Sequence, residues 1–458
     1  MTLARTWSVG LAGVHGAMVE IEVDMAAGVP QVILVGLPDA VVRQSIDRVR
    51  AAVVNAGAKF PQRRITIGLS PAAMPKQGSG FDLALAAAVL AASGTVSRRS
   101  VDRLVLLGEL GLDGSVRGIR GVLPAVLAAA RAGHQQVVVP VGNADEAALV
   151  DGVEVLAAGT LGEVIAHLAG RRLLSPHVRG ALPEAPAVPD LGDVVGQASG
   201  RRAVEVAAAG GHHLFLTGPP GAGKTMLAER LPGLLPPLDE EAALEVTAIH
   251  SIAGTLPVGA PLVTRPTFEA PHHSATMASL VGGGSGQIRP GALCRAHRGV
   301  LFLDEAPEFP RAVLDTLRQP LERGQVTIHR VSGSATFPCR AQLVLAANPC
   351  PCASAAGDAA CTCSALERRR YQSRLSGPLL DRIDLRVDLP PVTRAAWLDG
   401  MAAPETTAAV GRRVAAARAA AAERLAGTGL SVNSQVPGRL LRERWQVPRA
   451  SLRLAERA

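Results

Sequence analysis

A glycine-rich loop within residues 214–225, LFLTGPPGAGKT, has the composition and the context of a nucleotide phosphate site. An apolar strand precedes the loop and a helix follows it, so backbone N–H groups and the helix N-terminus can face a β-phosphate. Lys224 would reach the β- and γ-phosphates, and Thr225 would give its hydroxyl to Mg2+. The predicted phosphate-binding residues are Gly218, Pro219, Pro220, Gly221, Ala222, Gly223, Lys224 and Thr225.

A chance match in a glycine-rich chain is the alternative explanation of this loop. The chain has only three lysines, Lys59, Lys76 and Lys224, and relies otherwise on arginine. Because a guanidinium is planar and bulky, it does not replace the compact ammonium that contacts the phosphates in such a loop. A lysine at this position therefore favours a phosphate site.

Two acidic residues end a second apolar strand, GVLFLDE at 299–305. Asp304 would hold Mg2+ through water, and Glu305 would polarise the attacking water, which a hydrolysing ATPase needs and a nucleotide-binding module does not. A strand capped by solvent-facing acids is the alternative. Together with the loop, the acid pair predicts an enzyme that uses ATP and Mg2+.

A third strand, QLVLAANP at 342–349, ends in Asn348. The amide of Asn348 could orient the lytic water and sense the γ-phosphate, although an asparagine before proline is also an ordinary turn. The sequence therefore predicts Glu305 and Asn348 as catalytic residues of one site.

The strands that carry these residues belong to the third of four predicted segments. Residues 1–172 alternate apolar strands with helix-like stretches, which indicates a mixed α/β domain. Residues 173–190 are rich in proline without a sustained period, so they are predicted as a linker. Residues 191–390 are again α/β, and residues 391–458 contain the Ala/Arg-rich helices of a small helical domain.

Hydrophobic periodicity also predicts individual elements of the first domain. We expect helices over 38–56, 81–92 and 122–132. The predicted strands are 32–36, 65–69, 104–110 and 136–140.

The charge and composition of the chain limit its partners. A formal net charge of +8 and a pI near 9.8 suit a polyanion, because basic residues gain affinity by releasing phosphate counterions, with a general preference for arginine as the alternative. Aromatic residues make up only 2%, so aromatic platforms for stacking bases are not expected. The sequence shows neither a membrane-spanning apolar run nor a secretory leader, which predicts a cytoplasmic protein without a membrane partner.

Four cysteines are crowded into a C-x-C-x8-C-x-C pattern formed by Cys350, Cys352, Cys361 and Cys363. Four thiolates can close a tetrahedral Zn2+ site, which would be structural because no position stays open for a substrate. The one-residue spacing strains chelation by both sulfurs, and reduced thiols in a surface loop are the alternative. The remaining two cysteines, Cys294 and Cys339, are expected to be ordinary buried or half-buried residues.

The phosphate loop, the acid pair, Asn348 and SGPLLDRIDLRVDLP at 376–390 follow one another in an order that resembles the magnesium-chelatase-like AAA+ family. The likeness covers nearly the whole chain, including 19–53, 270–305 and NPCPC at 348–352. It implies an AAA+ ATPase core with a C-terminal helical lid, in a hexameric ring with ATP between subunits. It also implies helicase-like branch migration of single-stranded or branched DNA, independent of sequence, in natural transformation and recombination.

The same resemblance implies a role for Arg382. In related AAA+ proteins an arginine of the motif matched by LLDRID acts on the γ-phosphate of the neighbouring subunit. A planar cation at a subunit interface would stabilise transition-state charge and couple hydrolysis to assembly. A local ion pair of Arg382 with Asp381 or Asp384 is the alternative.

Residues 325–343, QVTIHRVSGSATFPCRAQL, contain two alternating β-type runs about a Ser-Gly turn, which predicts a hairpin. In the family the equivalent hairpin projects into the pore of the ring. The resemblance therefore implies that His329, Arg330 and Ser332 contact the DNA backbone without reading its sequence. The Gly/His-rich segment 270–291 resembles a second insertion that would also face the pore, and a plain surface loop is the alternative.

The first domain resembles the α+β Lon-protease and ribosomal-S5-like fold through PKQGSGFDLALA and residues 108–133. Lon uses a serine and a lysine that serves as the base, and the two matching positions here are Gly80 and Leu123. Ser79 is one residue away, but no lysine lies in the segment that would supply its base. The resemblance therefore implies a domain without peptidase activity, with a structural or a DNA- or partner-binding role.

Members of the family continue into helices with a second sensor arginine, whereas this sequence ends at RASLRLAERA. Arg442, Arg444 and Arg453 lie in this region, and none can be assigned that role. We expect either a shortened lid with impaired hydrolysis or an interrupted reading frame.

Two other functions remain open. The motor subunit of a metal chelatase would use the same ATPase, although we expect such a subunit to match only the AAA+ part. An ATP-binding module with impaired hydrolysis would follow from the missing lid.

Overall fold

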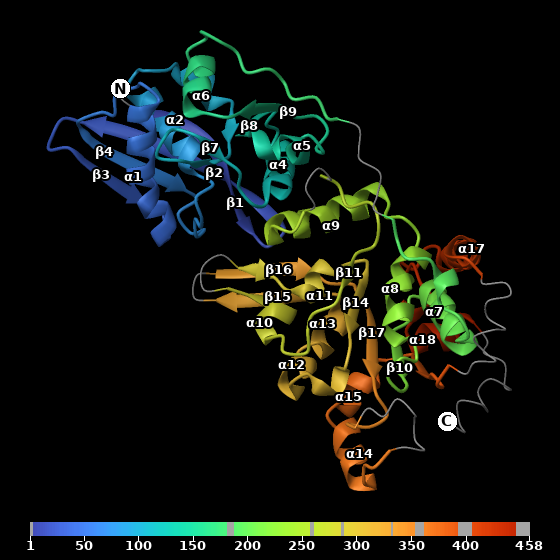
Figure 1. The fold of residues 1–458 in the computed structure, drawn as a ribbon. Coiled ribbons are helices and arrows are strands. Elements are labelled where there is room, and N and C mark those ends of the chain that lie inside the picture. Colours follow the sequence, from blue (N-terminus) through green and yellow to red (C-terminus); the bar gives the residue numbers. More distant parts are fainter. Residues whose placement is uncertain are drawn as a thin grey trace.

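The computed structural model describes residues 3–180, 187–256, 261–284, 288–330, 333–352, 361–392 and 405–445. In these ranges the chain forms a seven-stranded and a five-stranded sheet, with helices packed against both (Figure 1). The architecture is mixed α/β, as the sequence predicts.

The seven-stranded sheet has the order β3-β4-β2-β1-β5-β8-β9 and is antiparallel only where β2 pairs with β1 and β4. Its strands are β1 (Ala4–Ala12), β2 (His15–Ala26), β3 (Gln31–Val35), β4 (Arg64–Ser70), β5 (Val105–Leu106), β8 (Gln136–Pro140) and β9 (Glu154–Ala158). The helices packed around it are α1 (Ala40–Asn55), α2 (Asp82–Ala92), α3 (Arg98–Asp102), α4 (Val122–Arg131), α5 (Ala144–Ala147) and α6 (Leu161–Leu168).

Helix α2 forms the centre of this domain because its sequence is apolar on every side. All of its residues are buried, and its single acid, Asp82, lies 2.8 Å from the Nε of Arg48 on α1. The predicted strands 32–36, 65–69 and 136–140 are confirmed as β3, β4 and β8, and the predicted helices correspond to α1, α2 and α4.

The prediction of one strand over 104–110 is wrong. The apolar run is divided into β5 and β6 (Glu109–Leu110), and β6 pairs with β7 (Val116–Arg117) in a separate ribbon. The division falls at Gly108, whose φ of +157° lies in a region that only glycine adopts readily. Periodicity did not reveal this break because it reports side-chain pattern and not backbone angles.

The five-stranded sheet has the order β11-β14-β17-β10-β18, and all neighbouring strands are parallel. Its strands are β10 (Leu214–Thr217), β11 (Phe268–Glu269), β14 (Val300–Leu303), β17 (Gln342–Ala347) and β18 (Leu385–Asp388). Because β17 lies between β10 and β14, the residue after β17 emerges between the loops that follow the other two strands.

The remaining elements surround this sheet (Figure 1). The helices are α7 (Ala198–Gly210), α8 (Lys224–Leu234), α9 (Glu240–Ala253), α10 (Met277–Leu280), α11 (Ala292–Arg295), α12 (Arg311–Asp315), α13 (Arg318–Arg323), α14 (Ala365–Gln372), α15 (Gly377–Leu380), α17 (Thr407–Leu425) and α18 (Gly438–Arg444). Two ribbons are formed by β12 (Gly282–Gly283) with β13 (Arg289–Pro290) and by β15 (Gln325–Arg330) with β16 (Gly333–Pro338).

Helix α9 joins the two parts of the molecule. Ala248 of α9 is buried in the same apolar cluster as Val122 and Val126 of α4. The hydroxyl of Ser251, also on α9, donates a hydrogen bond to the carboxylate of Glu146, and burial raises the pKa of that carboxyl. These contacts fix the first domain to the second domain through α9.

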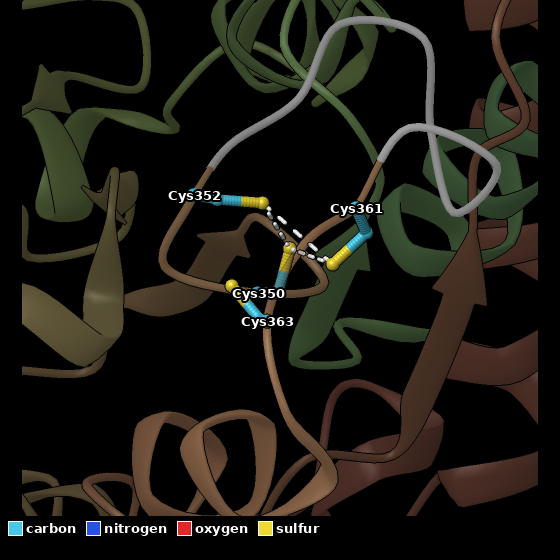
Figure 2. Close-up of side chains that lie close together, drawn as sticks. All are labelled: Cys350, Cys352, Cys361 and Cys363. Atoms are coloured by element: carbon cyan, nitrogen blue, oxygen red, sulfur yellow. Dashed lines mark hydrogen bonds between the residues drawn. The ribbon is translucent and has the colours of Figure 1, made fainter.

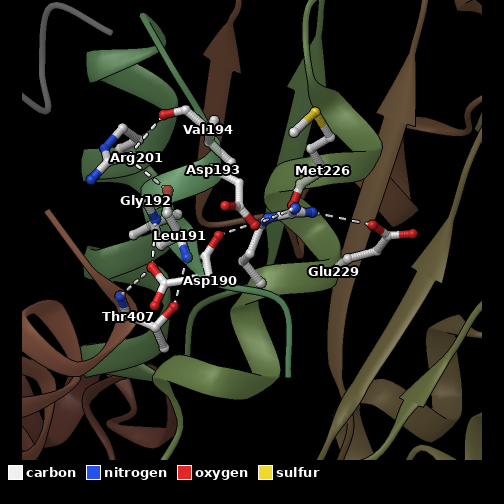
Figure 3. Close-up of polar contacts among 10 residues, drawn as sticks. Asp190, Leu191, Gly192, Asp193, Val194, Arg201, Met226, Glu229 and Thr407 are labelled. Atoms are coloured by element: carbon white, nitrogen blue, oxygen red, sulfur yellow. Dashed lines mark hydrogen bonds and ion pairs between the residues drawn. The ribbon is translucent and has the colours of Figure 1, made fainter. Parts of the chain in front are cut away.

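The end of the predicted linker is bound to the second domain (Figure 3). The carboxylate of Asp190 accepts hydrogen bonds from the N–H groups of Gly192 and Thr407, at 2.7 and 3.0 Å, and these contacts lower the pKa of Asp190. The buried guanidinium of Arg230 on α8 donates to the Asp190 carbonyl at 3.1 Å and lies 3.3 Å from Asp193. Helices α8 and α17 are thus tied together through the residues just before α7.

A second polar contact, around the buried side chain of His297, makes a pH-dependent contribution to stability. The Oε2 of Glu245 on α9 lies 2.8 Å from the Nε2 of buried His297 and 3.0 Å from the Nε of Arg298. The hydrogen bond from His297, strengthened by Arg298, lowers the pKa of Glu245 to about 2. Because the unfolded value is about 4.3, this stabilisation is present above about pH 4.3 and is lost as the pH falls toward the folded value.

We therefore expect Glu245→Gln to lower the free energy of unfolding by about 1–2 kcal/mol near neutral pH, after allowance for solvent screening of a partly exposed pair. The difference from the unmodified protein should shrink at acidic pH, where the carboxylate is protonated in both states. Urea unfolding of both proteins, near neutral pH and at acidic pH, measures this difference in the free energy of unfolding. The exposed Glu241→Gln on the same helix is the control, and an equal loss in both variants would contradict the assignment.

Candidate nucleotide site

The loop between β10 and α8 has the backbone geometry of a phosphate cradle. Gly221 and Gly223 have φ values of +77° and +85°, which glycine adopts without strain, and α8 begins directly at Lys224. A Cβ on Gly218 would lie 2.7 Å from the carbonyl oxygen of Leu389, so only glycine fits there. A glycine-rich loop of this kind at the start of a helix leaves backbone N–H groups accessible to an anion.

The side chain of Lys224 lies within this loop and is nearly fully buried. Its ammonium donates hydrogen bonds to the carbonyl oxygens of Gly218 and Pro219, at 2.6 and 3.0 Å, and to the Oδ1 of Asn348 at 3.0 Å. Burial lowers the pKa of Lys224, while the nearby Asp304 and Glu305 oppose that shift. The ammonium is therefore held inside the loop by two of its carbonyl oxygens and by the side chain of Asn348.

Asp304 connects the end of β14 to the phosphate loop. Its Oδ2 accepts a hydrogen bond of 2.8 Å from the hydroxyl of Thr225, and its Oδ1 accepts one of 2.9 Å from the Glu305 N–H. A hydroxyl and a carboxylate oxygen this close together are the ligands that Mg2+ takes beside a nucleotide. Thr225 and Asp304 thus fit the metal that an ATPase requires.

Glu305 has a left-handed backbone, with a φ of +50° that is rare for residues other than glycine. Its side chain is about half exposed, and its Oε2 lies 3.2 Å from the Nδ1 of His273. His273 is a residue that the sequence analysis did not assign to the site. In the sequence, the APHH run directly after β11 is the signal that could have identified His273. His273 reaches Glu305 because β11 and β14 are parallel neighbours, so the residues that follow the two strands lie at the same edge of the sheet.

Asn348 follows β17 and lies between the phosphate loop and the acid pair, as the strand order requires. Its Oδ1 accepts the hydrogen bond from Lys224 at 3.0 Å. Burial raises the pKa of Tyr371, on α14, to about 12, and the nearby backbone of Asn348 opposes that rise. The side-chain amide of Asn348 is therefore held by the lysine of the phosphate loop.

Arg382 lies at the opposite edge of the sheet from this loop. It precedes β18, whose Leu385 and Asp388 pair with Leu214 and Thr217 of β10, whereas the phosphate loop follows β10. Its ion-pair partner is Glu322 on α13, not the predicted Asp381 or Asp384, and the local alternative is wrong. Asp384 is instead 3.3 Å from the Nδ1 of His212.

A cavity of about 830 Å³ opens at this amino edge of the sheet. Its lining contains more arginine side chains than acidic ones. The arginines are Arg298, Arg323, Arg340, Arg382 and Arg418. An anionic group would be bound favourably at this edge.

The predicted hairpin is confirmed as β15 and β16, with buried Val326 and Ile328 alternating with exposed residues. His329 and Arg330 are exposed near its tip, and Ser332 lies outside the described residues. The turn between β1 and β2 packs closely on the hairpin. The approach is so close that a Cβ added at Gly13 would overlap the carbonyl oxygen of Thr336 on β16. The first domain therefore supports the hairpin directly.

The segment 270–291 is not a plain surface loop. Leu280 and Ile288 are buried in the core that β14 and β17 share, and β12 pairs with β13. His273 reaches the acid pair from the same segment.

Figure 2 shows the side chains of Cys350, Cys352, Cys361 and Cys363 gathered close together, with contacts drawn among the sulfurs of Cys350, Cys352 and Cys361. The Sγ of Cys350 lies 3.1 Å from that of Cys352 and 3.4 Å from that of Cys361, and all four lie within 4.8 Å of one another. The structure describes every cysteine of the chain, and none forms a disulfide. Cys294 and Cys339 are buried elsewhere, as expected, and burial raises their thiol pKa values.

The serine near the Lon-like dyad position has an acid beside it and not a lysine. The hydroxyl of Ser79 is hydrogen-bonded to Glu109, and both line a cavity of about 310 Å³. Lys76 is fully buried and donates to the carbonyl oxygens of Leu69 and Pro71. The predicted dyad positions, Gly80 and Leu123, carry no group that could attack a peptide.

Comparison with known proteins gives two family matches. The family described as "Magnesium chelatase, subunit ChlI" matches residues 190–397, and the family described as "Subunit ChlI of Mg-chelatase" matches residues 21–143. Together they cover most of both sheets. Among the described residues, no helix is both long enough and apolar enough to cross a membrane.

Individual relatives match along nearly the whole chain. An uncharacterized protein of Mycobacterium tuberculosis is 54% identical over 99% of this chain and 89% of its own length. YifB of Escherichia coli, also uncharacterized, is 42% identical over 91% of this chain and 82% of its own, and the competence protein ComM of Haemophilus influenzae is 41% identical over 95% and 86%. Lon protease 2 of Bacillus subtilis is 28% identical over 33% of this chain and 30% of its own length.

Proposed function

The chain belongs to the magnesium-chelatase-like family of AAA+ ATPases that includes YifB and ComM, and we propose that it is a ring-forming motor that uses ATP to move on DNA. The observation that carries the ATPase part is the arrangement at the carboxyl edge of the five-stranded sheet. Lys224 and Thr225 lie beside Asp304, Glu305 and Asn348 there.

Each of these residues has a distinct task in the proposed hydrolysis. Lys224 and the loop N–H groups bind the phosphates. Thr225 and Asp304 would hold Mg2+, which would neutralise charge on the phosphates. Glu305 accepts a proton from the attacking water, and Asn348 orients that water. His273 competes for the Glu305 carboxylate, so it has to release the carboxylate before Glu305 can act as a base.

The position of Arg382 supports a ring. The paired residues of β10 and β18 alone span roughly 10 Å, and Arg382 and the phosphate loop lie beyond opposite ends of them. Arg382 would therefore act on a neighbouring subunit's nucleotide and not on its own. The arginine-lined cavity at the same edge suits the phosphates that a neighbour would present, and the family resemblance implies six subunits in the ring.

The DNA part of the proposal is supported by the hairpin and by the relatives. His329 and Arg330 are exposed at a tip that carries no acidic side chain among its described residues, and the chain has a net charge of +8. Contacts of this kind to phosphates are independent of base sequence. The name of the competence protein ComM, which matches over 95% of this chain, favours DNA uptake or recombination as the setting.

A chelatase motor is the alternative. We expected such a subunit to match only the AAA+ part, but the second ChlI-named family matches residues 21–143, so this expectation is wrong. The first domain therefore does not separate the two functions. DNA dependence of the ATPase separates them, because a chelatase motor has no reason to respond to DNA.

We expect ATP hydrolysis by the purified full chain to rise severalfold with single-stranded or forked DNA and to vanish in Glu305→Gln, which retains nucleotide. Arg330→Ala should reduce the dependence of DNA binding on salt by about one phosphate contact, whereas the exposed Arg99→Ala in the first domain should leave it unchanged. Turnover that ignores DNA would contradict the DNA motor. Nucleotide binding without turnover under any condition would leave a binding module.

A further inference from the structure

The four-cysteine cluster lies next to the nucleotide site and contacts it through one helix. We propose that Cys350, Cys352, Cys361 and Cys363 bind one Zn2+ ion, and that this ion clamps helix α14 against the loop that carries Asn348. The first half of this proposal concerns the metal and stands alone. The second half, the effect on turnover, rests on the proposed ATPase.

The sulfur geometry fits a single tetrahedral ion. Sulfurs about 2.3 Å from a shared Zn2+ lie about 3.8 Å from one another in a regular tetrahedron and never more than about 4.6 Å apart. The separations of 3.1, 3.4 and 3.6 Å among Cys350, Cys352 and Cys361 are slightly shorter than that value, and the four sulfurs span up to 4.8 Å, so small side-chain shifts would close the cluster around one ion. A cluster of several irons would need to spread the sulfurs more widely, so one soft ion fits better.

The one-residue spacing does not prevent chelation. Cys350 is buried and Cys352 is exposed, yet their sulfurs lie 3.1 Å apart on the same side of the loop (Figure 2). Cys361 and Cys363 return to them from a part of the chain that begins directly before α14. Four thiols from two short segments thus meet at one point, which reduced thiols in an unconstrained surface loop have no reason to do.

The cluster is connected to the catalytic edge by α14. Cys363 is followed by Ser364, whose side chain caps α14 together with Glu367. Near the other end of the helix, buried Tyr371 lies close to the backbone of Asn348, which lowers the pKa of its hydroxyl against the larger effect of burial. Just beyond it, Arg374 lies 2.7 Å from Glu308, three residues after Glu305. Cys350 itself is two residues after Asn348. A metal at the cluster would therefore fix the chain just after Asn348, through Cys350, and the start of α14, through Cys363.

Metal binding can be tested without any activity measurement. The full chain, purified without chelators, is expected to contain about one zinc per chain, and Co2+ in its place should give the visible absorption of a tetrahedral thiolate site that Zn2+ then abolishes. Cys361→Ser with Cys363→Ser should lose the metal. Cys294→Ala with Cys339→Ala removes as many thiols from buried positions and should retain it. Bound iron, or Co2+ without thiolate bands, would overturn the proposal.

The clamp has its own readout, because Tyr371 is the only tyrosine of the chain. In protein containing fluorotyrosine, the single fluorine resonance should move between zinc-loaded and zinc-free states, and an unchanged resonance would overturn the clamp. If the proposed ATPase is correct, the zinc-free double variant should bind ATP normally and turn it over about 10- to 100-fold more slowly, as expected for a misplaced catalytic group. Loss of turnover in the unmodified protein would contradict the ATPase while leaving both metal results intact.

Discussion

Replacing Arg382 with alanine is expected to lower ATP turnover by about 10³-fold or more, because a cation that stabilises the transferring phosphoryl group contributes this much in related reactions. The affinity for ATP should change little, since Arg382 lies at the opposite edge of the sheet from the phosphate loop of its own subunit. Single-turnover hydrolysis and binding of a fluorescent nucleotide measure the two effects separately. The control is Glu322→Gln, which removes only the partner of Arg382 and should retain turnover.

Mixed rings test whether Arg382 acts on a neighbour. A subunit with Arg382→Ala keeps its phosphate loop, and a subunit with Lys224→Ala keeps its Arg382. Where the two meet in the right order, one complete site forms, so the mixture of two inactive proteins should regain activity. Rescue that fails despite mixed assembly, shown by differently tagged subunits, would place the role of Arg382 within its own chain.

Replacing Lys224 with alanine is expected to weaken ATP binding by about 30-fold or more, because removing one partner of a buried charge pair costs about 2–5 kcal/mol. The ammonium is nearly fully buried and makes its contacts to the loop carbonyls and Asn348. Isothermal titration with a non-hydrolysable ATP analogue measures the loss. Turnover should fall with it.

Glu305→Gln serves as the matched variant in the same experiment. The side-chain partner of Glu305 is His273 and not a residue of the phosphate loop, so the glutamine variant should bind ATP like the unmodified protein and fail only in turnover. Equal loss of binding in the two variants would indicate a collapsed site and not separate roles. Lys224→Arg should also bind poorly, since the guanidinium does not fit the space that the ammonium occupies.

Much of the nucleotide site could be predicted from the sequence because it is encoded locally. A strand, a glycine-rich loop and a lysine at the start of a helix are contiguous, and so are the strand and the acids at Asp304 and Glu305. Most of the predicted elements were confirmed for the same reason. The strand at 104–110 failed because one glycine angle at Gly108 changed the path of the chain.

The partners of the site residues could not be predicted in this way, because they come from distant parts of the chain. His273 meets Glu305 only because β11 and β14 are parallel neighbours, and Arg382 finds Glu322 on α13 in preference to the adjacent acids. Strand order in a sheet is decided by how helices bury both faces, which a local pattern does not record.

The sequence by itself determined the chemistry available to this protein, namely a phosphate loop, a pair of acids, an arginine motif and four thiols. Tertiary structure alone decided the distances among them: Asn348 beside Lys224, Arg382 at the far edge of the sheet, and four sulfurs within 4.8 Å. The physical reason is that residue type and short-range spacing are properties of the chain, whereas convergence of remote side chains follows from packing two sheets and their helices into one core.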